Sequence, residues 1–153
     1  MHILMCNDDG ILADGLRHLA SYLSQYYRIT VVAPANEQSA KSHALTTEVP
    51  LKLDACNGED ENPRLYALTG TPSDCMKFGL SYLLTDDMPD LVISGINHGF
   101  NLGSDVLYSG TVSAAMESCF YGIPGLALSV ERYSAERGDE MHPFIHELID
   151  KIY

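Results

Sequence analysis

The sequence predicts a three-layer, Rossmann-like α/β fold, in which a mostly parallel sheet is flanked by helices and carries a hairpin at one edge. Short apolar or β-branched runs alternate along the chain with stretches in which apolar residues recur at helical spacing. The runs are continuously apolar, which is typical of parallel strands that helices cover on both faces. Successive strand, helix and strand segments then form right-handed crossovers.

The first part of the chain predicts one such crossover. Residues 3–6 form a buried strand, a helix begins at residue 13 or 14, and residues 28–33 form the next strand, which a proline ends. The polar, weakly periodic stretch 34–47 follows. A loop of that length in a compact domain is more often functional than accidental.

The middle part predicts the edge hairpin. Residues 50–53 and 64–68 have strand character, and an acidic turn at 57–62 separates them. The next segment is rich in turn residues and leads into a helix, which we expect Ser73 or Asp74 to cap.

The last part predicts two more strands and two more helices. The expected segments are a strand at 90–94, a Gly- and Asn-rich loop at 95–110, a helix from 111 to Gly122, a strand at 125–130 and a helix from about 140 to 153. His142 and His146 lie four residues apart in that last helix, a spacing that can bind a metal ion. With no third ligand nearby in the sequence, we expect both to be solvated.

Length and composition limit the possible functions. The 153 residues suit one ordinary domain, so we expect a single α/β domain over 1–153. The formal net charge of -12 argues against long nucleic acids, whose binding depends on Lys and Arg. There is no apolar run long enough to span a bilayer and no signal-peptide pattern, so we expect a cytoplasmic protein with no membrane partner. The four cysteines form no C-x-x-C pair, which gives zinc or redox chemistry no support.

Three of the expected loops follow strands on the same side of the sheet. They span residues 7–10, 34–47 and 95–110. In a doubly wound sheet the carboxyl ends of the strands converge on one crevice, where ligands bind. These loops are therefore the candidates for function.

Oxygen atoms of Asp8, Asp9, Ser39 and Asn97 would face that crevice. Hard oxygen donors of this kind suit Mg²⁺ or Mn²⁺. Adjacent carboxylates repel each other, so a site that keeps both ionised usually needs a cation. For the first loop taken alone, a polar turn with Asp as a helix cap is an equally good interpretation.

The charge distribution supports a metal. Residues 78–131 contain no Lys or Arg. Within them, Ser109, Gly110 and Thr111 precede a helix and offer backbone N–H groups and hydroxyls that can hold an anion. A phosphate held there would need a metal ion for neutralisation. The alternative for this turn, and the favoured one in isolation, is a Ser/Thr helix cap.

Several segments match one known family in order. They are Asn7-Asp8-Asp9-Gly10, Gln38-Ser39 with Ser42-His43-Ala44-Leu45-Thr46, residues 69–75, residues 94–103 and residues 108–112. On these segments, which span residue 3 to about residue 130, the chain resembles the SurE family of stationary-phase survival proteins. Several motifs in one order are specific, whereas Asp-Asp-Gly alone is a weak signal.

The resemblance implies a metal-dependent 5'-nucleotidase, which hydrolyses nucleoside monophosphates and in some cases acts as a 3'-nucleotidase or exopolyphosphatase. It implies one divalent metal ion per subunit, Mg²⁺ or Mn²⁺, held by Asp8, Asp9, Ser39 and Asn97. Asp8, Asp9 and Asn97 are also the expected catalytic residues. The metal would polarise the phosphoryl oxygens and acidify a water, which Asp9 could position or deprotonate.

The resemblance also implies which residues contact substrate. Ser109, Gly110 and Thr111 are expected to hold the phosphate, and Asn101 and Ser104 to contact the substrate elsewhere. His43 and His98 lie in site loops, where a contact to phosphate and a supporting role are equally open.

The chain departs from the family pattern in three respects. Ala40 and Ser113 stand where the family usually has glycine, and a side chain would cost about 1 kcal/mol if either position needs a positive φ or a close backbone approach. The third departure is length, because family members continue beyond residue 153 into a C-terminal region with further strands and subunit contacts. The resemblance implies a homo-oligomer, which is a dimer or tetramer in the family.

Two other functions are compatible with paired aspartates after the first strand. One is a phospho-accepting receiver module, which also binds Mg²⁺ but needs an Asp after its third strand and a Lys after its fifth. Ser94-Gly95 and Ser129-Val130 stand at comparable strand ends. The other is a folded but inactive remnant.

Overall fold

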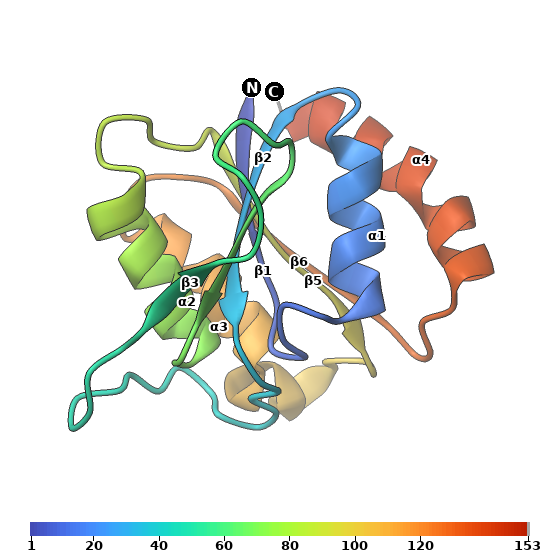
Figure 1. Ribbon diagram of the computed structural model, residues 1–153. Coiled ribbons are helices and arrows are strands. Elements are labelled where there is room, and N and C mark those ends of the chain that lie inside the picture. The colour runs from blue at the N-terminus through green and yellow to red at the C-terminus, as the bar shows by residue number, and fades with distance from the viewer. Residues whose placement is uncertain (153) are drawn as a thin grey trace.

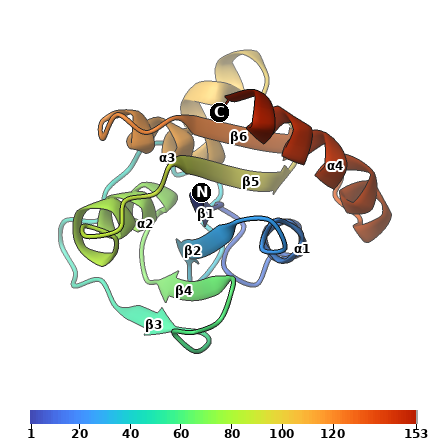
Figure 2. The ribbon, with the colours of Figure 1, turned by 90° about the horizontal axis from the view of Figure 1, so that it is seen from above.

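The computed structural model describes residues 1–152 and contains one six-stranded sheet between two layers of helices (Figures 1 and 2). The strands are β1 (His2–Cys6), β2 (Arg28–Pro34), β3 (Leu53–Ala55), β4 (Arg64–Leu68), β5 (Leu91–His98) and β6 (Gly125–Val130). Their order across the sheet is β3-β4-β2-β1-β5-β6, and every pair is parallel except β3 with β4. The predicted three-layer fold with a mostly parallel sheet is confirmed.

The helices divide between the two faces of the sheet. They are α1 (Asp14–Leu23), α2 (Pro72–Phe78), the π-helical turn η1 (Gly79–Leu83), the 3-10 helix η2 (Gly103–Tyr108), α3 (Gly110–Cys119) and α4 (Ala135–Ile152). Figure 2 shows α1 and α4 on one face and α2 and α3 on the other. In the described part of the chain, no helix has the length and apolar character needed to cross a bilayer.

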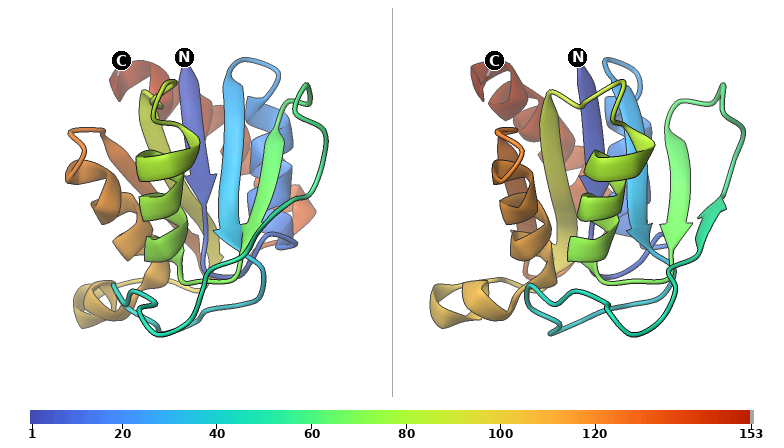
Figure 3. Two further views of the ribbon diagram at one scale, coloured as in Figure 1. Left: turned by 60° about the vertical axis from the view of Figure 1, so that its left-hand side comes forward. Right: turned by 90° about the vertical axis from the view of Figure 1, so that its left-hand side faces the viewer.

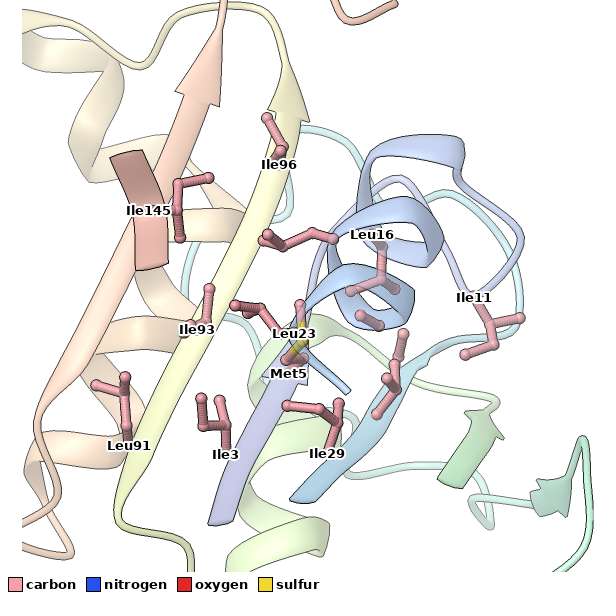
Figure 4. Packing of buried hydrophobic residues seen from close by; sticks show 14 of the residues in the cluster. Ile3, Met5, Ile11, Leu16, Leu23, Ile29, Leu91, Ile93, Ile96 and Ile145 are labelled. Atoms are coloured by element: carbon pink, nitrogen blue, oxygen red, sulfur yellow. The ribbon is translucent and has the colours of Figure 1, made fainter. Parts of the chain in front are cut away.

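The position of β1 in the middle of the sheet explains why residues 3–6 are all apolar. Ile3 and Met5 pack against α1 and α4, and Figure 4 shows them among the isoleucines and leucines of that core. Leu4 and Cys6 face the opposite core, under α2 and α3. Because successive side chains of a strand point to opposite faces, a strand covered on both sides needs apolar residues at every position.

The edge hairpin is confirmed, but its first strand is displaced. β3 covers residues 53–55 rather than 50–53, and Leu53 lies opposite Leu68 in the antiparallel pair. Pro50 has no N–H to donate to a ladder, so regular pairing begins only after it.

The cap of α2 differs from the prediction. The N-cap is Thr71, one residue before Pro72 and upstream of both predicted caps. The Thr71 hydroxyl accepts from the Asp74 N–H (3.1 Å), and an Asp74 carboxylate oxygen accepts from the Thr71 N–H (2.9 Å). This reciprocal pair is a capping box, for which Asp74 supplies the third helical position.

Two further boundaries were predicted wrongly. The loop expected at 95–110 contains the end of β5, which runs to His98, and all of η2. α4 begins at Ala135 rather than near residue 140. Ser134 starts it early, because its carbonyl accepts from the Gly138 N–H (2.9 Å) and its hydroxyl from the Arg137 N–H (3.3 Å).

Candidate functional site

The three candidate loops meet at the carboxyl ends of β1, β2 and β5. Figure 3 shows the irregular segment after β2 and the segment of η2 lying together beyond these strand ends. The Ser42 N–H donates to the Tyr108 carbonyl (3.1 Å), which joins the two segments directly. They enclose a cavity of about 670 Å³ that Asp8, Asp9 and Asn97 help to line. It lies where the chain, having built one half of the sheet from β1, crosses to β5 on the other side, and open α/β sheets bind ligands at such a point.

Asn7 shapes the first loop, a role that the sequence analysis did not assign to it. Its fully buried side chain donates to the Gly10 carbonyl (3.2 Å) and accepts from the Gly10 N–H (3.1 Å). Gly10 has a φ of 101°, which favours glycine. In the sequence, an Asn three residues before a Gly was the pattern that could have indicated this side-chain-closed turn. The closed turn directs Asp8 and Asp9 toward the cavity.

Asp8 packs against the first residues of α3. The hydroxyl of the fully buried Thr111 donates to Oδ1 of Asp8 at 2.6 Å. A Cβ on Gly110 would lie 2.9 Å from the Cβ of Asp8, so only glycine lets the helix approach this closely. Thr111, which was expected to help hold a phosphate, therefore contacts the carboxylate of Asp8.

The two aspartates are an unfavourable pair by themselves. Burial raises the pKa of Asp8, and the Thr111 hydroxyl opposes this rise. Burial, and then the negative charge of Asp8, raises the pKa of Asp9. The His98 N–H donates to Asp9 only weakly, at 3.4 Å. A cation between the carboxylates would favour their ionised forms.

Ser39, from the segment after β2, and Asn97, near the carboxyl end of β5, also line this cavity. Ser39 is exposed, and its hydroxyl donates to Glu37 at 2.6 Å. Asn97 follows the irregular part of β5, where the register with β6 shifts. Its side-chain N–H donates to the Gly99 carbonyl at 2.7 Å. The amide oxygen of Asn97 is then the atom that can bind a cation.

The charges around the cavity fit a divalent cation. Its lining contains no Lys or Arg. It includes five carboxylate side chains, those of Asp8, Asp9, Asp14, Glu37 and Asp105. Over residues 1–152, no three His, Cys, Asp or Glu side chains are grouped closely enough to bind a metal by themselves. A metal here would therefore depend on the neutral oxygens of Ser39 and Asn97 in addition to the aspartates. Such an all-oxygen donor set is suited to Mg²⁺ or Mn²⁺.

The residues expected to contact substrate lie at different depths. Asn101 and Ser109 line the cavity, Gly110 and Thr111 lie behind Asp8, and Ser104 is exposed on η2 outside the lining. The Ser109 hydroxyl accepts from the Val112 N–H (3.1 Å), so the alternative interpretation of this turn as a helix cap is confirmed. The Asn101 side chain donates to the Ser129 hydroxyl (2.7 Å).

The two departures from glycine have different consequences. Ala40 has a φ of 56°, a left-handed conformation that costs a residue with a Cβ about 1 kcal/mol or more. Ser113 lies inside α3, where its hydroxyl donates to the Ser109 carbonyl at 2.7 Å. The strain therefore falls on the Ser39 loop and not on α3.

The fold and the cavity together define a doubly wound α/β protein with an acidic ligand site at the carboxyl ends of its strands. The sequence model of the family described as "Survival protein SurE" matches residues 3–153. The chain belongs to the SurE family.

Named relatives and a solved structure agree with this family assignment. The chain is 49% identical to "5'-nucleotidase SurE" of Thermoanaerobacter sp. (strain X514), over 99% of this chain and 60% of that protein. It is 50% identical to "5'-nucleotidase SurE" of Vibrio vulnificus (strain YJ016), over 85% of this chain and 49% of that protein. The crystal structure of the SurE protein from Aquifex aeolicus superposes with a TM-score of 0.85 at 38% identity, covering 99% of this chain and 60% of that one. The chain thus spans about 60% or less of the length of these relatives.

Proposed function

We propose that this chain carries the catalytic centre of a divalent-metal-dependent phosphatase that hydrolyses nucleoside monophosphates. The observation that carries the proposal is the cavity at the strand ends, which the buried Asp8, the half-buried Asp9 and three further carboxylates line without any Lys or Arg. A phosphate monoester is an anion and would be repelled from such a cavity unless a cation binds first. The printed names of the relatives, 5'-nucleotidase SurE, support a nucleotide as the phosphate carrier.

In this proposal one Mg²⁺ or Mn²⁺ ion is held by Asp8, Asp9, Ser39 and Asn97. When bound, the ion would supply Lewis-acid polarisation of the phosphoryl oxygens and a more acidic water. Asp8 acts mainly as a fixed ligand, since Thr111 already engages its Oδ1. Asp9 has only the long contact to the His98 N–H, which supports it as the group that positions or deprotonates the attacking water.

The substrate would approach from the open side of the cavity. Ser109 and Asn101 border it and are proposed to contact the phosphate and the adjacent part of the nucleotide. Gly110 and Thr111 would add the backbone N–H groups at the start of α3. Ser104, on exposed η2, would reach substrate only at the rim.

Release of inorganic phosphate from a panel of nucleoside monophosphates, with Mg²⁺ or Mn²⁺, tests the proposal. We expect metal-dependent turnover that Asp9→Asn abolishes and that Asp60→Asn, in the exposed turn 57–62, leaves unchanged. Turnover without metal, or none with any metal, contradicts the enzyme proposal for this chain. 3'-Nucleotides and polyphosphate in the same panel define the substrate range.

We also propose that the chain self-associates. Among the described residues, β6 pairs only with β5 and ends the sheet, and most of its residues are exposed or half-buried. An edge strand of this kind is prone to pair with another chain. Sedimentation velocity of the purified chain should show a dimer or larger species, and a well-behaved monomer at all concentrations contradicts this.

A further inference from the structure

The segment that carries Ser39 has no regular structure of its own. Residues 35–52 contain neither helix nor strand, and Ser39 is exposed. Its hydroxyl bonds to Glu37 within the same segment, so this contact moves with the loop and cannot place it. The Gln38 N–H donates to the Asp8 carbonyl (2.7 Å), which ties the residue before Ser39 to the first loop. The rest of the segment must be held by contacts further along it.

A buried carboxylate on α3 provides such a contact. Glu117 is only 5% exposed, and Nε2 of His43 lies 2.7 Å from its Oε2. Lys77 also lies near Glu117, but its Nζ is 4.0 Å from Oε1 and its side chain is half-exposed. A buried carboxylate is costly unless it is paired and hydrogen-bonded. His43 therefore supplies the close partner, across 74 positions of sequence.

Neither His43 nor Glu117 is among the residues that line the cavity. His43 comes four residues after Ser39 in the loop, and Glu117 six residues after Thr111 in α3. The start of α3 contacts Asp8 through Thr111, and its later part contacts the Ser39 loop through Glu117. One helix thus links two of the segments that supply metal-binding oxygens.

We propose that His43 and Glu117 are positioning residues that hold the Ser39 loop against α3 and so assemble the metal site before the ion arrives. The inference concerns the metal site of the proposed function and needs only that the site binds a divalent ion. A ligand loop already in place loses less conformational freedom when the ion binds. Loss of the pair should weaken metal binding while turnover at saturating metal changes little.

Other contacts should keep the loop attached when the pair is removed. The Ser42 hydroxyl donates to the Leu107 carbonyl (2.8 Å), and the Thr46 hydroxyl donates to Asp74 (2.6 Å). The variants should therefore fold, with the greater freedom confined to the loop.

The test is Mn²⁺ binding by the purified chain, followed from the electron paramagnetic resonance signal of free Mn²⁺. We expect His43→Ala and Glu117→Met each to weaken Mn²⁺ affinity roughly tenfold. The double variant should be no weaker than either single one, because both remove the same link. His43→Gln retains a side-chain N–H and should keep most of the affinity. Glu147→Met, on the exposed face of α4, is the matched control and should have no effect.

Hydrogen exchange gives a second readout that does not depend on the metal. Amides of the segment 35–49 should exchange faster in the two single variants, while those of β1 and β5 keep their protection. If His43→Ala leaves Glu117 too costly to bury and does not fold, the double variant removes that charge and carries the test.

The outcomes separate this inference from the proposed function. Unchanged Mn²⁺ affinity in the double variant, or additive losses from the two single changes, overturns the positioning role. A wild-type chain that binds Mn²⁺ but releases no phosphate overturns the phosphatase and leaves the positioning role to be judged by the affinities. A wild-type chain that binds no Mn²⁺ overturns both.

Discussion

The hydroxyl of Thr111 donates a 2.6 Å hydrogen bond to Oδ1 of Asp8 across 103 positions of sequence. Both side chains are buried, and the bond fixes the orientation of a carboxylate that the proposed metal would bind. A threonine that the family resemblance marks as a phosphate contact thus acts on a side chain that we propose as a metal ligand.

Replacing Thr111 with Val tests that relationship. The isosteric change removes the hydroxyl while keeping the shape, so Asp8 loses its orienting donor. Changes to such supporting bonds typically cost 10–100-fold in metal affinity, and we expect a loss of that size for Mn²⁺ by titration. Thr111→Ser keeps the donor and should stay near the wild type. Equal losses in both variants would contradict an effect of the hydroxyl on Asp8.

Gly110→Ala should damage the same site by a different route. The new Cβ would lie 2.9 Å from the Cβ of Asp8 and 3.1 Å from Pro72, so Asp8 or α3 must move. We expect lower phosphatase activity and a loss of about 1–3 kcal/mol in the free energy of unfolding, measured with urea. Gly58→Ala, whose Cβ would lie 3.7 Å from the nearest side chain, is the control and should be close to neutral. An active, fully stable Gly110→Ala protein would show that the close approach is not needed.

Ala40→Gly should stabilise the protein. Ala40 has a φ of 56°, so glycine relieves strain of about 1–3 kcal/mol in the loop that carries Ser39. This relief exceeds the roughly 0.4–1 kcal/mol that the added freedom of the unfolded chain costs. Ala44→Gly is the matched control in the same loop, where the φ is not positive. There the added freedom of the unfolded chain should instead destabilise by roughly 0.4–1 kcal/mol. Urea unfolding measures whether each variant raises or lowers the free energy of unfolding. A lower value for Ala40→Gly would contradict strain at Ala40.

Two buried histidines should contribute stability to the apo chain that is lost below about pH 6.5, the usual pKa of histidine. His142 is only 4% exposed on α4, packed against Tyr22, and burial lowers its pKa. His2 is also buried, and burial and then the charge of Arg28 lower its pKa. The unfolded chain takes up these protons at a higher pH than the folded chain does. The contribution of the two histidines to the free energy of unfolding is therefore fully present above pH 6.5, and it is lost as the pH falls toward the lowered pKa values.

Urea unfolding at several pH values from 7.5 to 5 measures this slope. His142→Phe should flatten it, by up to about 1.4 kcal/mol per pH unit for one proton. His146→Phe changes a less buried histidine on the same helix and should leave the slope due to His142 in place. Identical slopes in the wild type and His142→Phe would exclude the buried histidine as the cause. This burial also corrects the expectation that His142 is a solvated helix residue.

Family membership removes the support for a receiver module. Every named relative that we describe is a 5'-nucleotidase SurE, and the cavity has no lysine in its lining. The inactive remnant is distinguished from the enzyme only by the phosphate-release assay.

The sequence by itself determined the order of strands and helices, the parallel sheet and the three loops that meet at its edge. These features follow from the period and continuity of apolar residues, which are local properties of the chain. It also indicated Asp8, Asp9, Ser39 and Asn97 as candidates that could share one site, since parallel strands present their carboxyl ends together.

Only the tertiary structure decided what those residues touch. That Thr111 donates to Asp8, and that Glu117 binds His43, depends on the packing of α3 against the loop after β1 and against the Ser39 loop. This packing brings together residues 103 and 74 positions apart. The burial of His142 likewise depends on α4 packing against α1, which brings its ring against Tyr22. Local patterns encode elements, but side-chain partners are chosen by distances that exist only after the chain has folded.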